Sequence, residues 1–358
     1  MKQERLERFF ENMKREGLEQ AVVSDPAGIF YLTRRWIEPG ERLLALYLNR
    51  SGGNKLFVNE LFTVPEDLGV EKIWFSDTDD SMALLSGAID HSKPLGVDKN
   101  LPARFLLPLI SVGAGTSFVN VSPCVDAVRS CKDEEEKAFM REASRLNDAG
   151  MAEFKKCIRP GITERELASG MEKIYRSLGA DGYSFLPLVG FGKNAAIGHH
   201  EPDDTPLREG DCVLLDVGCK KDNYCADMTR TFFFKSVPEK SREVYEIVRR
   251  ANLAAEAIIK PGVPFCEIDR AARSVIEQAG YGKNFTHRLG HSIGIEVHEP
   301  GDVSSANTNT VKPGMTFSIE PGVYLDGKVG VRIEDLVLVT EDGCEVLNHF
   351  PKELQVVE

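Results

Sequence analysis

The sequence predicts an α/β (α+β) protein, with a small mixed-sheet domain at the N-terminus and a larger domain made of two related halves. Three observations support this prediction. Helical and extended patterns alternate over residues 1–125, an acidic helix start lies near residue 133, and two blocks of sequence recur further on in the same order. A chain of 358 residues is long enough for two domains of ordinary size.

The first domain is predicted to span residues 1–128. An amphipathic pattern predicts a helix over residues 3–17, and the strands RLLALYLNR and NKLFVNEL flank the turn SGGN, as in an antiparallel pair. The remaining strand and helix segments are, in order, EQAVVSD, PAGIFYLTRR, EKIWFSD, SMALLSGAI, PLGVD and PARFLLPLISVG. Such an alternation is typical of helices packed on a mixed sheet.

The second domain, residues 129–358, is predicted to begin with a long helix whose first turn is acidic, as the helix dipole favours. The chain then repeats itself. RPGITEREL begins at residue 159 and KPGVPFCEI at residue 260, an offset of 101, and REGDCVLLDVG at 208 aligns with KPGMTFSIEPG at 312, an offset of 104. Each half predicts a helix followed by a strand pair. The alternative to an internal repeat is a chance match of common start and stop signals, because Pro-Gly often precedes helices and Gly often precedes strands.

The first of these aligned strands contains an acid, Asp216, within the apolar run VLLDV. A buried carboxylate is costly unless something pairs with it. The turn signal KKDN follows, and a two-residue turn at Lys221–Asp222 would place Asp216 directly opposite Asp227 on the returning strand. We therefore expect a facing pair of carboxylates in this half.

The second half has the same arrangement. A hairpin turn at Asp326–Gly327 places Glu320 opposite Glu334. Four carboxylates at one site repel one another, unless raised pKa values, arginines or cations relieve the repulsion. Arg332 lies on the strand face of Glu334, whereas Arg230 faces away, and one arginine does not balance four acids. The pattern therefore predicts bound divalent cations.

Five of the seven histidines lie around or between the two acidic hairpins. Three of them fall within the segment HRLGHSIGIEVHEP, where Gly290 and Gly294 favour an extended, tightly turned backbone over a helix. A metal site of this kind commonly adds a nitrogen ligand to its carboxylates. The candidates are His199, His200, His287, His291 and His298.

These residues resemble those of the dinuclear pita-bread metallopeptidases, which include proline dipeptidases (prolidases), aminopeptidase P and methionine aminopeptidase. Five motifs carry the resemblance in order: LLDVG, ADMTRTF, GHSIGIEVHEP, SIEPGVY and VRIED. The resemblance implies a pita-bread domain with a pseudo-twofold internal repeat. GIFYLT and ERLLALYL resemble, more weakly, the creatinase/prolidase N-terminal domain. Methionine aminopeptidases lack that domain, so it favours the branch that cleaves Xaa-Pro bonds, as does the ending KELQVVE.

The resemblance also implies roles for individual residues. His199 and His298 would contact the substrate and transition state, and Glu320 would relay a proton as well as bind metal. His287 would line the pocket for the proline side, and Arg332 would bind the substrate carboxylate. Asp227 and Glu334 match the acids that bridge the two metals. The full implied ligand set is Asp216, Asp227, His291, Glu320 and Glu334.

The implied activity is hydrolysis of the Xaa-Pro bond at the N-terminus of dipeptides or short peptides, through a hydroxide that bridges two divalent ions. Oxygen-rich ligation with one histidine favours Mn²⁺, and Co²⁺, Zn²⁺ and Fe²⁺ are the alternatives. The choice between an Xaa-Pro dipeptidase and an Xaa-Pro aminopeptidase stays open. Two departures concern the shape of the subsites: Ser292 replaces the usual glycine of GHG, and TRRW follows IFYL where Thr-Gly is common.

Three other functions compete with this one. A catalytically silent pita-bread protein could bind peptides, but such relatives typically lose ligands, and all five positions are filled here. GHSIG, residues 290–294, formally matches the GxSxG motif of serine hydrolases, yet no helical pattern follows it. GFGKNA resembles a dinucleotide-binding loop, and again no helix follows.

Composition limits the partners and the compartment. Asp plus Glu number 56 against 44 Lys plus Arg, and the net charge of −12 argues against nucleic acid or an anionic membrane as the main partner. No apolar run approaches the ~18 residues of a membrane span, and the charged N-terminus has no secretory pattern. Eight cysteines without a CxxC pair fit a reduced, cytoplasmic protein. The resemblance implies a homodimer.

Overall fold

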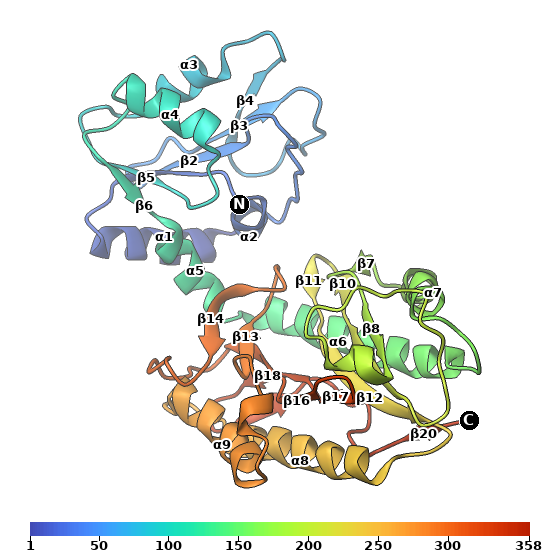
Figure 1. Cartoon of the computed structure of the whole chain (residues 1–358). Helices are drawn as coiled ribbons and strands as arrows, with labels where there is room; N and C mark the ends of the chain where they lie inside the picture. Colours follow the sequence, from blue (N-terminus) through green and yellow to red (C-terminus); the bar gives the residue numbers. More distant parts are fainter. The chain divides into compact units, whose positions relative to one another are not determined.

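The computed structural model describes residues 1–358 and divides into two compact units, Met1–Arg129 and Ser130–Glu358. Figure 1 shows the helices and strands of each unit. None of the helices combines the length and the apolar character that crossing a membrane requires.

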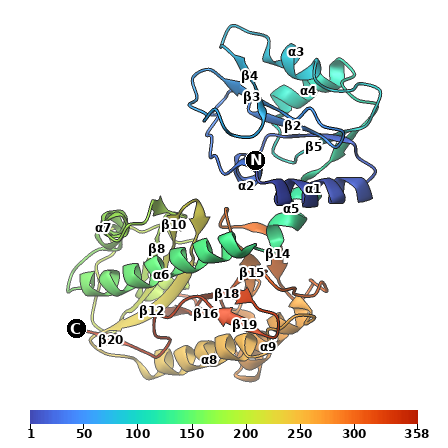
Figure 2. The same cartoon turned by 180° about the vertical axis from the view of Figure 1, so that it is seen from behind.

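The N-terminal unit contains one mixed sheet of six strands in the order β4-β3-β2-β1-β5-β6. The pairs β1–β2 and β2–β3 are antiparallel, whereas β3–β4, β1–β5 and β5–β6 are parallel, so the predicted mixed sheet is confirmed. Helices α3 and α4 lie on one face and α1 and α2 on the other (Figures 1 and 2). The strands are β1 Gln20–Val23, β2 Ala45–Asn49, β3 Lys55–Asn59, β4 Glu71–Phe75, β5 Leu95–Val97 and β6 Phe118–Asn120. The helices are α1 Gln3–Arg15, α2 Pro26–Thr33, α3 Ser81–Ser86, α4 Ala103–Ser111 and α5 Ser122–Ser130.

In the second unit, the central strands of the two larger sheets lie between helix α6 on one side and helices α8 and α9 on the other (Figures 1 and 2). The helix predicted to begin near residue 133 starts there, because the Asp133 side chain caps α6 in a capping box with Glu136. The helices are α6 Glu134–Cys157, α7 Glu164–Ser177, α8 Glu239–Glu256 and α9 Phe265–Gln278, with short 3₁₀ turns η1 Gly192–Ala196 and η2 Gly282–Asn284.

The first large sheet of this unit has the order β20-β12-β9-β8, and the second has the order β14-β13-β15-β18-β19. The strands of the first are β8 Leu188–Phe191, β9 Cys212–Val217, β12 Met228–Phe234 and β20 Val356–Val357. Those of the second are β13 Gly290–Ser292, β14 Glu299–Val303, β15 Thr316–Ile319, β18 Asp335–Val339 and β19 Cys344–Val346. Smaller ladders are formed by β7 Gly182–Tyr183, β10 Cys219–Lys221 and β11 Tyr224–Cys225, and by β16 Gly322–Leu325 and β17 Val329–Arg332.

The internal repeat predicted from the sequence is confirmed. Helices α7 and α9 begin at residues 164 and 265, which are 101 apart, and β9 and β15 begin at 212 and 316, which are 104 apart. Two isolated bridges repeat the pattern at the helix starts, Thr163 with Pro206 and Pro264 with Thr310. The two halves therefore share one supersecondary plan.

Alternate residues of β9 face two different hydrophobic cores, as the two-residue period of a strand requires. Val213 and Leu215 belong to the core under α6 and α7, whereas Cys212 and Leu214 belong to the core under α8 and α9. The apolar run VLLDV is thus buried on both faces, which explains its near-continuous hydrophobicity. Because its neighbours on β9 are buried in both cores, the backbone of Asp216 is held firmly in place.

The structure corrects the predicted register of the first hairpin. Asp216 on β9 pairs with Thr229 on β12, so it does not lie opposite Asp227. The turn between β10 and β11 falls at Asp222–Asn223, whose φ values are 51° and 67°. Asp and Asn tolerate this left-handed backbone well, and the two-residue hairpin turn requires it, so the turn lies one residue later than predicted.

The predicted register of the second hairpin is confirmed. Ile319 pairs with Asp335 on one side and Gly322 with Arg332 on the other, so Glu320 and Glu334 lie opposite each other between the two ladders. Gly327, with a φ of 67°, supplies the left-handed residue of the turn.

Candidate metal centre

Carboxylates from both halves of the second unit converge on one histidine. One ligand atom each of Asp227, His291 and Glu334 lies within 4.8 Å of the others, and all three side chains are buried. They come from three places in the chain: Asp227 directly precedes β12, His291 lies on β13, and Glu334 joins β17 to β18. The fold therefore assembles from distant segments a cluster that no short motif contains.

The other two predicted ligands lie at the edge of this cluster. Glu320 directly follows β15, and its Oε1 is 3.6 Å from His291 Nε2, the same distance that separates Nε2 from Asp227 Oδ2. The charge of Asp216, on β9, acts on the carboxyl groups of Asp227, Glu320 and Glu334. All five predicted ligands are thus brought together.

Burial and mutual repulsion act in the same direction on these acids. Burial raises the pKa of Asp227 well above its usual range, and Glu334 and Asp216 raise it further. Burial likewise raises the pKa of Glu334, with a further contribution from Glu320. For Glu320 burial raises the pKa to about 7. Such shifts mean that the protein alone does not stabilise the ionised form of these acids, which a bound cation would stabilise.

The protonation of His291 follows from its contacts. Its Nδ1 lies 3.2 Å from the carbonyl of Ser292, which only accepts, so Nδ1 carries the proton and Nε2 presents a lone pair. Burial and the neighbouring His298 lower the pKa of His291 to about 3, so the ring stays neutral. A lone pair that faces the carboxylates of Asp227 and Glu320 is suited to a shared cation.

Two buried carboxylate oxygens, Asp216 Oδ1 and Asp227 Oδ1, have no hydrogen-bond partner in the protein. Leaving such an atom unsatisfied costs about 1–3 kcal/mol, and more when it is charged. Together with the neutral imidazole and the crowded acids, they form a donor set that fits hard divalent cations.

Hydroxyl groups orient the acids from behind. Thr229 Oγ1 donates to Glu334 Oε2 at 2.6 Å, and Ser318 Oγ donates to Glu320 Oε1 at 3.2 Å while it accepts from the backbone N–H of His291 at 3.0 Å. Sequence analysis missed both hydroxyls. The only hint in the sequence was a hydroxyl side chain within a strand, Thr229 in MTRTFFF and Ser318 in TFSI, which does not by itself mark a site.

The predicted substrate residues Arg332 and His287 are linked through a tyrosine. Arg332 is buried, and its guanidinium donates to Asp216 Oδ2, to Thr229 Oγ1 at 2.9 Å and to Tyr324 Oη at 3.0 Å. Tyr324 Oη lies 2.9 Å from His287 Nε2. Burial, with a contribution from Arg332, lowers the pKa of His287 to about 4, so this ring is neutral as well.

The two predicted catalytic histidines, His199 and His298, are both exposed, and His298 lies beside the acidic centre. The ring of His298 lies 4.3 Å from that of His291, centroid to centroid, in an edge-to-face arrangement. Burial and then Arg288 lower the pKa of His298, and the charges of Asp216 and His199 also act on it. His199, which comes from the other half of the unit, thus acts on His298 through its charge.

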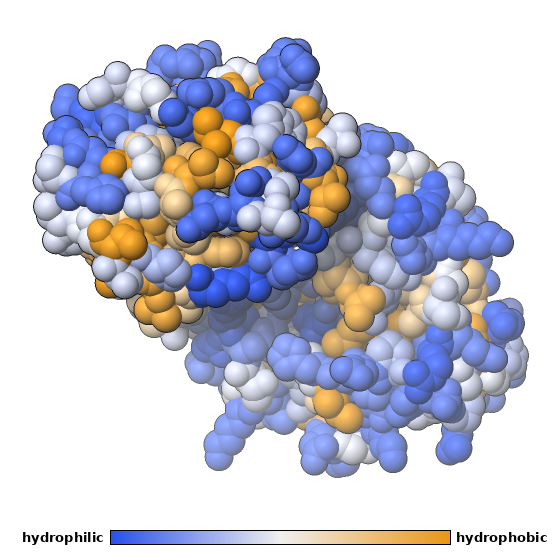
Figure 3. Space-filling view, turned by 90° about the horizontal axis from the view of Figure 1, so that it is seen from above, coloured by the Kyte–Doolittle hydropathy of each residue, from blue (hydrophilic) through white to orange (hydrophobic).

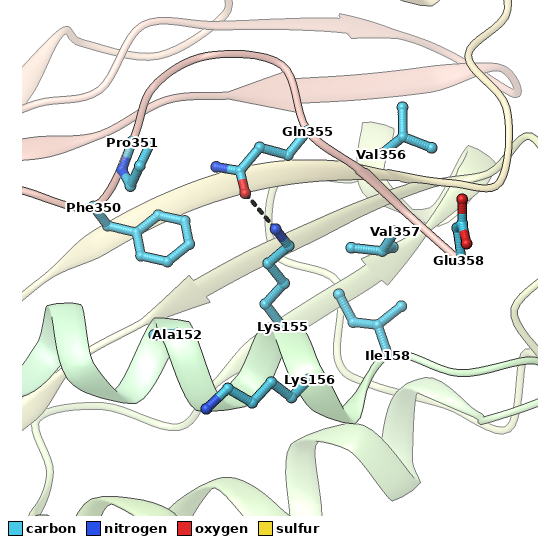
Figure 4. Close-up of a pocket in the computed structure, with 10 residues that line it drawn as sticks. All are labelled: Ala152, Lys155, Lys156, Ile158, Phe350, Pro351, Gln355, Val356, Val357 and Glu358. Carbon is cyan, nitrogen blue, oxygen red and sulfur yellow. Dashed lines mark hydrogen bonds between the residues drawn. The ribbon is translucent and has the colours of Figure 1, made fainter.

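Two other features do not compete with the acidic centre. Ser292 of the GxSxG match lies on β13 and is followed by a loop instead of a helix, so it is not on a nucleophile elbow. A pocket of about 570 Å³ lies between α6 and the C-terminal residues, and it contains none of the predicted site residues (Figure 4). Lys155 Nζ donates to Gln355 Oε1 at 2.6 Å across it.

Comparison with known proteins places the chain in a family. Residues 138–341 match the metallopeptidase family M24, and residues 5–131 match the creatinase/prolidase N-terminal domain. The chain belongs to metallopeptidase family M24. An uncharacterized peptidase of Staphylococcus saprophyticus is 37% identical over 353 residues, which cover 97% of this chain and 100% of that protein. The family resemblance predicted from the five motifs is thereby confirmed, and the chain is a metal-dependent peptidase.

Several solved structures are similar to this chain over nearly its whole length. A dipeptidase from Pyrococcus horikoshii matches with a TM-score of 0.93 at 33% identity, over 99% of this chain and 100% of that one. A prolidase from Thermococcus sibiricus matches with a TM-score of 0.93 at 32% identity, over 100% and 99%. An Xaa-Pro dipeptidase from Bacillus anthracis matches with a TM-score of 0.92 at 27% identity, over 99% of each chain. The predicted two-part fold, pita-bread domain included, is therefore confirmed.

Proposed function

We propose that this M24 peptidase is a dinuclear enzyme that hydrolyses the Xaa-Pro bond at the N-terminus of dipeptides or short peptides, with Mn²⁺ as its metal. The observation that carries the proposal is the buried cluster of Asp227, His291 and Glu334, flanked by carboxylate oxygens without partners. The prolidase and Xaa-Pro dipeptidase among the similar structures support the choice of substrate.

We assign five ligands, Asp216, Asp227, His291, Glu320 and Glu334, with Asp227 and Glu334 shared between the two ions. Asp227 supports this role because burial and three neighbouring acids all act on it. When bound, two divalent ions activate water near neutral pH and polarise the scissile carbonyl. The protein's part is to hold the ligands in place, through Thr229 on Glu334 and Ser318 on Glu320.

Protein groups handle the proton and the oxyanion. Glu320, whose Oε1 lies 3.6 Å from His291 Nε2, is positioned to take up a proton from the attacking water and to pass it to the departing proline nitrogen. His298 and His199 are exposed at the rim, where each can donate a hydrogen bond to the substrate carbonyl oxygen.

The specificity for proline is assigned to His287 and its surroundings. A proline nitrogen carries no N–H after peptide-bond formation, so recognition has to use the ring instead of a backbone hydrogen bond. His287 is neutral and packs edge-on against Phe285, with ring centroids 5.1 Å apart. Arg332, held by Asp216 and Tyr324, is the cation proposed to attract the carboxylate of the product side.

We also propose that the protein is a cytoplasmic homodimer. All eight cysteines are free thiols, as is usual in a reducing compartment. Leu107, Ile110 and Val112 are exposed on and just after α4, and Figure 3 shows apolar side chains gathered on the surface of the N-terminal unit. Light scattering after gel filtration tests the dimer, and a mass of one chain would contradict it.

The substrate is tested by parallel digests of Ala-Pro, Ala-Pro-Ala and Met-Ala-Ser with the Mn²⁺-loaded protein, followed by identification of the products. We expect free proline from Ala-Pro and no cleavage of Met-Ala-Ser. Cleavage of Ala-Pro-Ala at its first bond would extend the activity to longer peptides. Release of methionine from Met-Ala-Ser, with Ala-Pro left intact, would contradict the proposed specificity.

A further inference from the structure

The loop at residues 197–205 carries His199 but has no regular structure of its own. It connects η1 to the approach of β9, and the His199 side chain is exposed. A catalytic group on such a loop has to be fixed by contacts elsewhere in the loop, because a misplacement of about 1 Å can cost roughly a hundredfold in rate.

The residue next to His199 makes such a contact. His200 Nε2 lies 2.5 Å from Glu164 Oε2, and the two side chains are 9% and 0% exposed. A carboxylate only accepts, so Nε2 is the donor. Glu164 is the first residue of α7, where the helix dipole stabilises its negative charge.

Glu164 accepts hydrogen bonds from the chain on both sides of His199. Its Oε1 accepts from the backbone N–H of Phe191 at 2.7 Å and from Asn194 Nδ2 at 3.1 Å, on the side before the loop. Its Oε2 accepts, besides His200, from the backbone N–H of Asp203 at 3.2 Å, on the side after His199. Since four donors already occupy this carboxylate, it is built as an anchor and not as a second metal site, although Asp203 and His200 lie close enough to form one.

The other exposed histidine has a comparable neighbour. His298 is followed by Glu299, whose Oε2 lies 2.7 Å from Lys132 Nζ, with side-chain exposures of 1% for the lysine and 4% for the glutamate. Glu299 Oε1 also accepts from the backbone N–H of Ile295 at 3.0 Å. At both rims of the centre, the residue after the histidine is thus tied into a buried, charged contact.

We infer that Glu164 and His200 form a positioning pair, which holds His199 over the acidic centre in the orientation that the reaction needs. The inference rests on the proposed function, in which His199 contacts the substrate. Because the side chains of His200 and Glu164 are 9% and 0% exposed, the pair is assigned no contact with substrate and acts through the loop that it anchors.

A double-mutant cycle tests the inference. In the wild-type background, His200→Ala is expected to lower kcat on Ala-Pro about tenfold, with KM and Mn²⁺ content nearly unchanged. In the His199→Ala background the same change is expected to have almost no further effect, because its route of action is already gone. Additive losses in the double variant would overturn the inference, as would a loss of bound metal in His200→Ala.

Three further variants control for folding and charge. His200→Gln keeps a donor that can reach Glu164, so it should recover part of the lost kcat. Arg165→Ala removes an exposed ion pair, Arg165 with Asp204 at 2.9 Å, between the same helix and the same loop, and it should leave kcat within about twofold because surface pairs contribute little. Glu164→Gln should act like His200→Ala. An Arg165→Ala variant as impaired as His200→Ala would overturn the assignment.

Hydrogen exchange separates this inference from the proposed function. Faster exchange of the amides at residues 203–205 in His200→Ala than in wild type is expected, whatever the substrate. An inactive wild-type protein would contradict the proposed function, but faster exchange would still support the anchor. Unchanged exchange in His200→Ala would overturn the anchor, even in an enzyme that cleaves Ala-Pro.

Discussion

The second unit contains two buried clusters of acidic residues. The neighbouring residues Glu334 and Asp335 belong to different clusters. Glu334 faces the acidic centre, whereas Asp335 faces a cluster with its own cations. Asp335 Oδ1 lies 2.7 Å from Arg230 Nη2, and its Oδ2 lies 2.9 Å from Lys352 Nζ. Lys352 also pairs with Glu256 at 2.6 Å. This second cluster thus holds two acids and two cations.

The acidic centre is balanced differently. Its four acids share one arginine, Arg332, and the two buried oxygens without partners belong to Asp216 and Asp227. A buried charge without a partner is strongly unfavourable, so the centre needs cations from outside the chain, whereas the Asp335 cluster does not. Burial alone therefore does not mark a functional acid, and the supply of cations distinguishes the two clusters.

The largest expected effect is on the acidic centre. Asp227→Asn should abolish Ala-Pro hydrolysis and metal binding, because it removes a charge proposed to be shared by both ions. Steady-state kinetics and metal analysis of the purified variant measure the two losses. A variant that retains more than about a tenth of wild-type activity would contradict the assigned role, since even outer-shell changes at metal sites cost about 10–100-fold.

The equivalent change in the other cluster should affect stability instead. Asp335→Asn leaves Arg230 and Lys352 without their shared carboxylate, and breaking a buried pair in this way costs about 3–5 kcal/mol. Urea unfolding measures the difference in the free energy of unfolding. If the variant that still folds bound no Mn²⁺, the division between the two clusters would be wrong.

A smaller effect concerns pH. Burial, with a contribution from Asp335, raises the pKa of Glu256 to about 7. Because the folded state binds this proton more tightly than the unfolded state, the contribution of Glu256 to stability is fully present below about pH 4.5 and is lost as the pH rises through 7. Ionisation of this group costs up to about 3 kcal/mol. Glu256→Gln should flatten the dependence between pH 5 and pH 8 in urea unfolding, and an unchanged slope would exclude Glu256 as its source.

The smallest effect should come from Arg332→Ala. If Arg332 attracts the product-side carboxylate, KM should rise about tenfold for Ala-Pro and less for Ala-Pro-Ala, whose carboxylate lies one residue further away. Kinetics with both peptides measure the difference. Equal increases for the two would indicate that Arg332 serves only to hold Asp216 and Tyr324.

The two hairpins show what sequence alone could predict. The register of Glu320 and Glu334 followed from Asp326–Gly327, because glycine at the turn is a strong local signal. The register of Asp216 failed, because KKDN allows turns one residue apart and the left-handed pair Asp222–Asn223 decides between them. The acids still converge, since the pseudo-twofold fold and not one ladder sets their positions.

The supporting residues could not be predicted, for a different reason. Thr229 meets Glu334 across 105 residues of sequence, and Glu164 meets His200 across 36. Neither contact leaves a local pattern, because a hydroxyl in a strand or an acid at a helix start has ordinary local explanations. Tertiary packing makes these contacts, between the two halves for Thr229 with Glu334 and within the first half for Glu164 with His200.

Metal analysis by mass spectrometry tests the central claim most directly. The protein is loaded with Mn²⁺, dialysed to remove loosely bound ions, and measured beside Asp227→Asn and Asp335→Asn. We predict two ions per chain in the wild type and in Asp335→Asn, and fewer than one in Asp227→Asn. A wild-type protein with fewer than one ion per chain, or equal retention by the two variants, would contradict the account.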